Sequence, residues 1–380
     1  MSRVLLVLTV VATSLFALPA PTFTTPGSDW GTGDLFVSVG DPAYREARGA
    51  FALFSSEGVA RHVTLVDKNR GFTAGCTIDP ATGFLWTTSG SGNSLAVFDD
   101  IAASDGGYPL LQTFNLRALT FLQARARGYV GSVLFNANGH LLVGTSDGAN
   151  RLLELAPDGK LIDSFAMPAD GGGIRSFDLA ADQHTVFYTS PQDNVVRRYD
   201  LATRQPLPDF ARLVDGSLHE LRLLPNDQGL LVAGSAGITR LATSGAFLTR
   251  YWLPETRFLA LSISPDARTF WTSNTSGQLL RFDLASEKLV AGPIDSGFPA
   301  IRGLCAKNEY LAAADICRVT GPDGQETEAK CPALETCSNL SDDDGDGLAD
   351  GADPDCQVPG FLHELPPMSL VTSSTVTGKK

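Results

Sequence analysis

The chain has 380 residues, of which 43% are hydrophobic, so it is long and apolar enough to bury a large core. Its formal net charge of −13 excludes nucleic-acid binding, which needs a surplus of basic side chains to neutralise phosphates. With 38 glycines and 3 methionines, the composition is typical of a chain that is rich in turns and poor in long helices.

Residues 1–20 have the pattern of a signal peptide. Arg3 supplies a positive charge, residues 4–18 form an apolar stretch, and small residues follow it. A buried first strand or a membrane anchor is the alternative, but the stretch is short for a membrane span and the chain has no second one. We therefore expect a secreted, periplasmic or cell-surface protein without a membrane span.

Residues 30–331 repeat with a period near forty. The clearest unit, residues 130–167, has four strand-like segments, VGSVLF, HLLVGTS, RLLELA and KLIDSFAM, and two strong turn sequences, NANG and APDG. Segments like the second strand occur seven times, around Phe36, Trp86, Val143, Tyr188, Val232, Trp271 and Ala312. This period with four short strands predicts an all-β fold, a β-propeller, rather than a sandwich or a stack of unrelated hairpins.

The number of blades has two solutions. Seven second strands favour a seven-bladed propeller, in which residues 301–331 form the last blade. The first unit, however, lacks an obvious first strand, which residues 21–29 or the C-terminal tail can supply. In the six-bladed alternative, the sequence RGLCAK at residues 302–307 completes the N-terminal blade and closes the ring.

The unit rhythm also points to known propellers. G-x-L-x-V, a small polar turn and then R-L-x-E-L-x-P-D-G resemble the NHL-repeat, streptogramin-lyase-like and gluconolactonase-like group. The resemblance spans about residues 30–330 and concerns repeat architecture, which serves unrelated activities. A gluconolactonase-like metal site would need a Glu, an Asn and an Asp that converge on the axis, and the sequence does not identify such a trio.

Propeller enzymes gather polar residues at the mouth of the central channel. The candidates in this chain are Arg175 in GGIRSFD, His219 and Glu220 in SLHELRL, Arg257 in ETRFLAL and Arg302 in AIRGLCA. A His–Glu pair can act as acid and base, and arginines can bind a carboxylate. Neighbouring strand residues point to opposite faces, so we expect that His219 and Glu220 do not both face the channel. The alternative is that all of these are ordinary channel or loop residues.

The most specific motif is SDDDGDGLADGADPDC, residues 341–356. With Asp342 at position 1 of a twelve-residue loop, aspartates occupy positions 1, 3, 5, 9 and 12, and glycine occupies position 6. This spacing supplies the hard oxygen ligands and the sharp bend that Ca²⁺ requires, whereas a solvated acidic linker is the alternative. We therefore predict a calcium module at residues 332–356. Its ligands are Asp342, Asp344, Asp346, the carbonyl of Leu348, Asp350 and Asp353.

The same stretch resembles the thrombospondin type 3 repeat and a short module of secreted bacterial proteins, C-x-N-x-x-D-D-D-G-D-G-x-x-D-x-x-D-P-D-C. The resemblance implies calcium ligation by these aspartates and a Cys337–Cys356 disulfide that closes the loop. Versions of the module often carry a further cysteine after the ninth loop position, where this chain has Gly351.

The six cysteines are an even number, which predicts disulfides in an exported protein. Cys317 and Cys331 flank the turn GPDGQ and can pair across two strands. Cys76 and Cys305 lie in first strands and can pair near the axis if their blades are neighbours, which the six-bladed arrangement favours. Residues 357–380 are rich in Pro, Ser and Thr, so we expect a flexible tail, or a closing strand from SLVTSSTV.

Together these features favour an exported propeller that binds a protein or small-molecule ligand and carries a structural Ca²⁺ in its C-terminal module. The alternative is a hydrolase or lyase that acts on a small lactone-like substrate. That alternative requires Arg175, His219, Glu220 and Arg302 to converge on one pocket.

Overall fold

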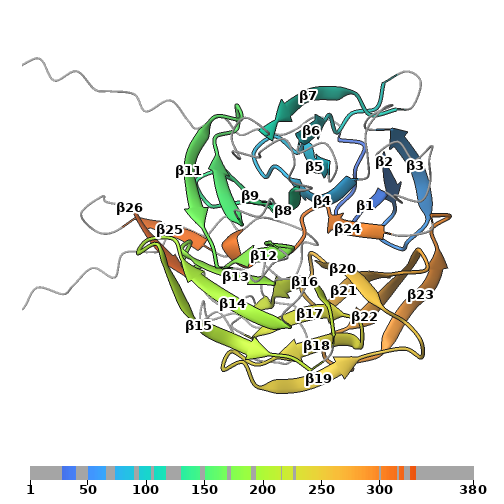
Figure 1. The fold of residues 1–380 in the computed structure, drawn as a ribbon. Helices are drawn as coiled ribbons and strands as arrows, with labels where there is room; N and C mark the ends of the chain where they lie inside the picture. Colours follow the sequence, from blue (N-terminus) through green and yellow to red (C-terminus); the bar gives the residue numbers. More distant parts are fainter. Residues whose placement is uncertain are drawn as a thin grey trace, which may run out of the picture.

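The fold is that of a six-bladed β-propeller, seen in a computed structural model along its axis (Figure 1). The structure describes residues 28–39, 50–65, 73–89, 94–103, 107–116, 130–145, 150–168, 173–189, 194–214, 216–225, 228–298, 301–314, 316–320 and 326–330. In these residues every blade is a four-stranded antiparallel sheet, and the 3-10 helix η3 (Ala312–Ala314) follows the last blade strand, β24.

We number the blades in chain order. Blade 1 contains β1 (Leu35–Val39), β2 (Ala50–Phe54), β3 (Ala60–Leu65) and β24 (Ile301–Ala306). Blade 2 contains β4 (Thr73–Ile78), β5 (Leu85–Ser89), β6 (Ser94–Phe98) and β7 (Leu110–Asn115). Blade 3 contains β8 (Val130–Phe135), β9 (Leu141–Thr145), β10 (Arg151–Leu155) and β11 (Leu161–Ala166).

The second half of the ring repeats this pattern. Blade 4 contains β12 (Ser176–Leu179), β13 (Thr185–Thr189), β14 (Val195–Asp200) and β15 (Gln205–Arg212). Blade 5 contains β16 (Leu218–Leu223), β17 (Leu230–Gly234), β18 (Gly237–Leu241) and β19 (Phe247–Tyr251). Blade 6 contains β20 (Phe258–Ile263), β21 (Thr269–Asn274), β22 (Gln278–Asp283) and β23 (Leu289–Asp295).

Blade 3 shows why these sequences form hairpins. The turns predicted at NANG and APDG are present, and in both the glycine has a positive φ, 73° at Gly139 and 81° at Gly159. Each glycine N–H donates to a carbonyl three residues back, at 3.0 Å from Asn136 and 2.8 Å from Ala156. Burial decreases from the innermost strand of the blade to the outermost one. β8 is buried along its whole length, whereas β11 is mostly exposed.

The prediction of seven blades is wrong, because β24 supplies the strand that the first unit lacks. It pairs antiparallel with β1, with Leu304 opposite Val37, so the ring closes with strands from both ends of the propeller. The segment around Ala312, taken as a seventh second strand, forms η3. Beyond it, β25 (Ile316–Thr320) and β26 (Glu326–Lys330) form a separate two-stranded sheet.

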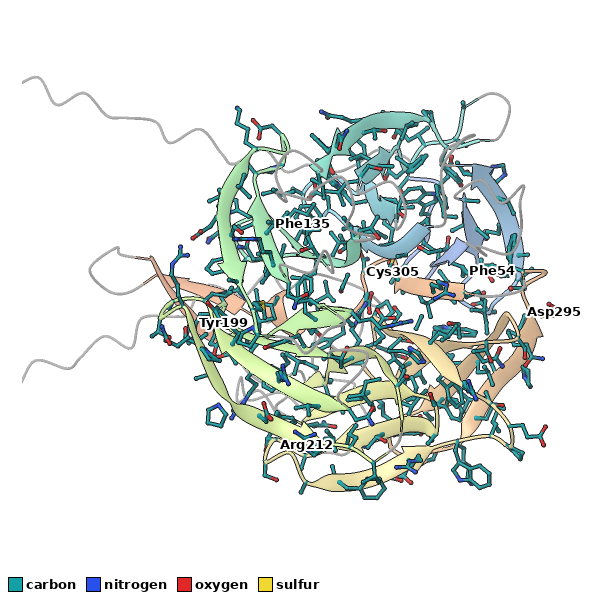
Figure 2. The ribbon with its side chains drawn as sticks, viewed as in Figure 1. Phe54, Phe135, Tyr199, Arg212, Asp295 and Cys305 are labelled. Carbon is teal, nitrogen blue, oxygen red and sulfur yellow. A yellow bond between two sulfur atoms is a disulfide. The ribbon has the colours of Figure 1, made fainter. Side chains whose placement is uncertain are left out.

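The core lies between the blades rather than within them. Each pair of neighbouring blades encloses one cluster of buried apolar side chains. Between blades 6 and 1, for example, Trp271 packs with Leu35 and Ile301. Figure 2 shows side chains filling these spaces, with Phe54 and Phe135 buried inside the ring. A single blade cannot bury both of its faces, so the closed ring is the stable unit.

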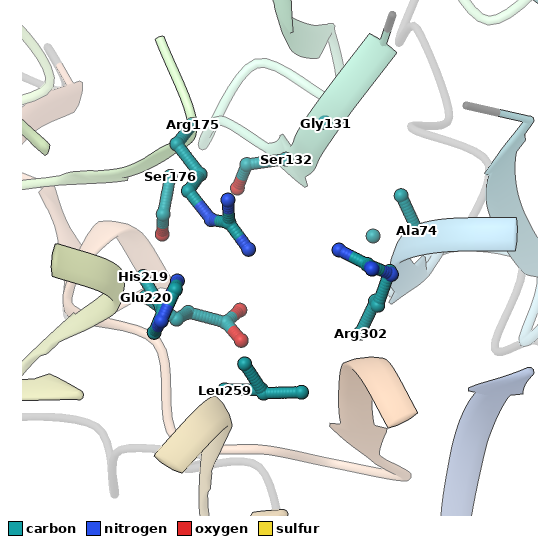
Figure 3. Close-up of a pocket in the computed structure, with 10 residues that line it drawn as sticks. Ala74, Gly131, Ser132, Arg175, Ser176, His219, Glu220, Leu259 and Arg302 are labelled. Atoms are coloured by element: carbon teal, nitrogen blue, oxygen red, sulfur yellow. The ribbon is translucent and has the colours of Figure 1, made fainter. Parts of the chain in front are cut away.

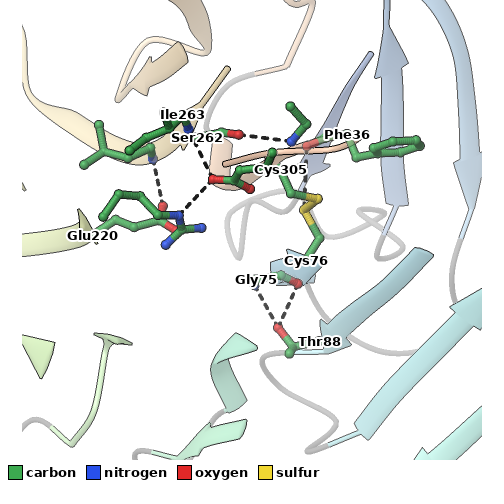
Figure 4. The surroundings of a disulfide bond; sticks show 12 residues. Phe36, Gly75, Cys76, Thr88, Glu220, Ser262, Ile263 and Cys305 are labelled. Atoms are coloured by element: carbon green, nitrogen blue, oxygen red, sulfur yellow. Dashed lines mark hydrogen bonds and ion pairs between the residues drawn. A yellow bond between two sulfur atoms is a disulfide. The ribbon is translucent and has the colours of Figure 1, made fainter. Parts of the chain in front are cut away.

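A disulfide joins Cys76 on β4 to Cys305 on β24, with Cα atoms 5.8 Å apart (Figure 4). This confirms the pairing expected for neighbouring blades near the axis. The predicted pairs Cys317–Cys331 and Cys337–Cys356, the signal peptide at residues 1–20, the calcium module and the tail at residues 357–380 lie outside the described side chains. Within the described residues, no helix is long and apolar enough to cross a membrane.

Candidate functional site

The innermost strands of the blades carry an irregularity at the same end. In β4, β8, β16 and β20 the register shifts near the first residues of the strand, and β24 shifts against β1 on either side of Arg302. In β16 the two residues His219 and Glu220 lie opposite the single residue Ala233, which is the arrangement of a β-bulge. A bulge interrupts the alternation of side chains, so it re-aims side chains at the axis.

These irregular positions line one axial pocket (Figure 3). The pocket is partly open, has a volume of about 110 Å³ and receives residues from every blade. Its lining residues are Ala74, Gly75, Gly131, Ser132, Arg175, Ser176, His219, Glu220, Leu259 and Arg302.

The pocket is asymmetric because two neighbouring pairs of inner strands approach very closely. A Cβ built at Gly303 would overlap the carbonyl oxygen of Ala74, and one built at Gly75 would overlap that of Gly131. Blades 1 and 2 therefore need glycine, Gly303 and Gly75, near the position where blade 5 carries Glu220. The small residues of blades 1, 2 and 3 leave room for the pocket. The large polar side chains enter it mainly from blades 4 and 5 and from Arg302.

Two guanidinium groups enter the pocket from opposite sides, as Figure 3 shows. Arg175 directly precedes β12, and Arg302 is the second residue of β24. Arg257, which directly precedes β20, is exposed and outside the lining, but its charge acts on His219. The pocket is thus strongly cationic in a chain whose net charge is −13.

His219 is a neutral imidazole in this setting. Burial and the charges of Arg175, Arg302 and Arg257 lower its pKa to about 3. Its Nδ1 is buried and has no hydrogen-bond partner among the described residues. The neutral ring therefore carries one donor nitrogen and one acceptor nitrogen at neutral pH.

Glu220 lines the pocket but is also tied into a buried cluster behind it. Its Oε1 lies 3.0 Å from Nη2 of Arg222, and its Oε2 accepts the N–H of Leu261 at 2.9 Å. Arg222 also contacts Glu309, with Nε 2.9 Å from Oε1. Asp178 acts on the same guanidinium through its charge. One guanidinium thus faces three buried carboxyl groups.

This imbalance decides the protonation of the cluster. Burial raises the pKa of Glu220 to about 7, although Arg222 opposes the shift. Burial also raises the pKa of Asp178 and of Glu309. Since one cation cannot neutralise three anions in a region of low dielectric constant, the cluster retains a proton near neutral pH.

The cluster belongs to a set of hydrogen bonds that join the inner strands of neighbouring blades. Backbone N–H groups of one blade donate to side-chain oxygens of the preceding blade. These pairs are Leu221 to Ser176 at 3.2 Å, Leu223 to Asp178 at 2.9 Å, Leu261 to Glu220 at 2.9 Å and Ala306 to Ser262 at 3.0 Å. Figure 4 shows the bonds to Glu220 and Ser262. Ser176 and Glu220 therefore have structural partners, and the arginines and His219 dominate the chemistry offered to a ligand.

The structure brings together Arg175, His219, Glu220 and Arg302, four of the five candidates from the sequence, and leaves Arg257 outside the lining. The expectation that His219 and Glu220 would not both face the channel is wrong, because the bulge in β16 replaces the simple alternation. Sequence reasoning missed Arg222, Glu309 and Asp178. The available sign was a charged residue inside an apolar strand, as in LHELRL and SFDL. Among the described residues no cluster of His, Cys, Asp or Glu could hold a metal ion.

A scan against models of known protein families finds none that matches this chain, and a search of the curated proteins finds no match. The resemblance to NHL-like and streptogramin-lyase-like propellers therefore stays a prediction from the repeat rhythm, beside the six-bladed fold that the structure shows.

Proposed function

We propose that this protein is an exported β-propeller that binds a small organic anion in its axial pocket. The single observation that carries the proposal is the convergence of Arg175 and Arg302 on one pocket in an acidic chain. A guanidinium group stays charged at every physiological pH, and its planar fork fits two carboxylate oxygens at once. Two such groups on opposite sides favour a ligand with two acidic groups.

The neutral His219 fits the same ligand. An imidazolium there would add a third positive charge beside two guanidinium groups, whereas the neutral ring adds a hydrogen-bonding group at no electrostatic cost. The carboxyl group of Glu220 is engaged by Arg222 and by the N–H of Leu261, and its charge also acts on Arg175. Because burial raises its pKa to about 7, it is partly protonated at neutral pH and offsets the charge of Arg175 only in part.

Binding is favoured over catalysis by the state of the acid–base groups. A general base is most effective when its pKa lies near the working pH, and the pKa of His219 is about 3. Glu220 has a better pKa, about 7, but its carboxyl oxygens already have partners. Hydrolysis or elimination on a small lactone-like substrate is the second candidate. It is kept because His219 and Glu220 share one pocket with two arginines that can hold an acidic product.

Export and calcium binding complete the proposal. They rest on the signal-peptide pattern of residues 1–20 and on the aspartate spacing of residues 342–353. In this arrangement the Ca²⁺ stabilises the C-terminal module, and the propeller carries the ligand. Membership of the NHL-like group remains part of the proposal through the repeat rhythm.

The test is calorimetry with succinate, using uncharged succinamide as the matched neutral probe. We expect succinate to bind and succinamide not to bind. Arg175→Gln and Arg302→Gln should each lose at least about tenfold in affinity, since a charge-assisted hydrogen bond contributes roughly 1.5–3 kcal/mol. Arg198→Gln removes the same charge from an outer strand, where the guanidinium contacts the carbonyl of Pro208, and should change affinity less than about twofold.

Two results would contradict the proposal. One is the absence of any heat with succinate or with the other dicarboxylates of similar size. The other is an equal loss of affinity in Arg175→Gln and Arg198→Gln. That result would show that the effect comes from the overall charge of the protein and not from the pocket. Turnover of γ-butyrolactone that disappears in His219→Gln would instead support the second candidate.

A further inference from the structure

We propose that the axial pocket binds its anion together with a proton, and that His219 accepts this proton. The inference rests on the proposed function, because it describes the regulation of the same site. It makes the affinity for the anion depend on pH in a direction that the geometry fixes.

The charged groups around His219 come from three neighbouring elements and from its own strand. Arg175 precedes β12, Arg257 precedes β20 and Arg302 lies in β24, and each acts on the imidazole. On its own strand β16, Glu220 lines the pocket and Arg222 lies behind it. The remaining pocket residues have no titratable side chains, and they are Ala74, Gly75, Gly131, Ser132, Ser176 and Leu259.

In the empty pocket these surroundings keep the imidazole neutral. Its pKa is about 3 because protonation would place a further cation in a partly buried site beside three guanidinium groups. An anion held between Arg175 and Arg302 offsets their charge. Two of the causes that lower the pKa of His219 are then weakened, and the added negative charge favours the imidazolium directly. The pKa of His219 therefore rises towards its ordinary value when the anion binds.

Thermodynamic linkage makes the effect reciprocal. If the anion raises the affinity of His219 for a proton, protonation raises the affinity of the pocket for the anion by the same factor. The affinity for a fully ionised anion therefore increases as pH falls from the pKa of the bound state towards about 3. One coupled proton changes the affinity by up to about tenfold for each pH unit in that window.

Glu220 titrates in a different range. Its pKa is raised to about 7, mainly by burial, and an anion nearby disfavours its charged form further. Proton uptake near pH 7 therefore belongs to Glu220 and its cluster, and uptake near pH 5 belongs to His219. The two contributions can be separated by the pH at which they occur.

The experiment uses ethane-1,2-disulfonate, a strong-acid counterpart of succinate that stays ionised at every pH of interest. Binding to the full chain is measured by calorimetry at pH 5 and 7 in two buffers that differ in ionisation enthalpy, at constant ionic strength. We expect the wild type to bind at least about tenfold tighter at pH 5 than at pH 7, with uptake of nearly one proton at pH 5. His219→Gln should still bind but should take up no proton at pH 5, and Glu220→Gln should keep this uptake.

A second measurement uses the wild type alone, so it does not depend on whether a variant folds. The C2–H resonance of His219 in the wild type should titrate below pH 4 without the disulfonate and near or above about pH 6 with it. Binding without proton uptake at pH 5, or equal uptake in wild type and His219→Gln, would overturn the coupling and leave anion binding intact. If neither the disulfonate nor succinate binds at any pH, the proposed function itself is wrong.

Discussion

Cys76 and Cys305 are separated by 229 residues in the sequence and yet form a disulfide between the innermost strands of blades 2 and 1. Cys305 lies on β24, the strand that closes the ring by pairing with β1. The ring is therefore closed twice, once by the backbone hydrogen bonds of β24 and once by a covalent bond to the neighbouring blade. Both closures depend on β24, so each should stabilise the other.

Removal of this disulfide should lower stability markedly. A disulfide stabilises chiefly by restricting the unfolded chain, and the effect grows slowly with loop length, so Cys76→Ala with Cys305→Ala should cost about 3–5 kcal/mol. Urea unfolding with and without a reductant measures the change. The reductant should destabilise the wild type and should have a smaller effect on the double variant. Equal unfolding midpoints for oxidised wild type and double variant would contradict a role in closing the ring.

Arg222 should be essential for the joint between blades 4, 5 and 6. Arg222→Met leaves Glu220 and Glu309 buried without their cation, and breaking a buried pair in this way costs roughly 3–5 kcal/mol. Lys160→Met is the matched control, because Lys160 pairs with Asp158 at the exposed surface and its loss should leave stability nearly unchanged. Chemical denaturation of both variants makes the comparison. Similar small losses of stability in both variants would mean that the buried cluster stabilises the protein no more than a surface ion pair does.

The repeat could be read from the sequence because it depends on local patterns. The turns NANG and APDG and the apolar strands of residues 130–167 fix blade 3 by themselves. The blade count could not be read in the same way, because it depends on a contact between β1 and β24 at opposite ends of the ring. The apolar run around Ala312 looks like the other second strands, and only the three-dimensional arrangement makes it a 3-10 helix.

The site was predicted in part for a similar reason. Arg175, His219, Glu220 and Arg302 stand out as polar residues in equivalent positions of the repeat. His219 and Glu220 both line the pocket because of a one-residue bulge, and nothing in the sequence reveals this bulge. The partners of Arg222 come from distant parts of the chain, since Glu309 follows β24 and Asp178 lies in β12. Only the closed ring brings these residues together.

The calcium module should bind one Ca²⁺ through the loop of residues 342–353. Asp344→Asn and Asp353→Asn each remove a charged ligand and should weaken binding at least about tenfold, because affinity in such loops depends on the number of charged ligands. Asp158→Asn, in an exposed turn of the propeller, is the control and should leave Ca²⁺ binding unchanged. Calorimetry of the EDTA-treated protein measures this directly. If the treated protein binds no Ca²⁺, the calcium site predicted from the spacing of the aspartates is wrong.

The buried cluster should also make stability depend on pH. The pKa of Glu220 is about 7 in the folded protein and near 4.5 in the unfolded chain, so the folded state binds more protons between these values. The contribution of Glu220 is therefore fully present below pH 4.5 and is lost as pH rises through 7, a change on the order of 3 kcal/mol. Glu220→Gln removes this contribution, so stability should rise more steeply with pH in the variant than in the wild type between pH 4.5 and 7.

His219 acts in the opposite direction on the acid side. Its pKa is about 3 in the folded protein and near 6.5 in the unfolded chain, so its contribution is complete above pH 6.5 and is lost as pH falls towards 3. Between about pH 4.5 and 6.5 this contribution opposes that of Glu220. In His219→Gln only the Glu220 contribution remains, so stability should fall more steeply with rising pH than in the wild type. Urea unfolding of the wild type and both variants at half-unit steps from pH 4 to 8 separates the two slopes. Identical profiles for the three proteins would show that neither side chain titrates differently in the folded and unfolded states.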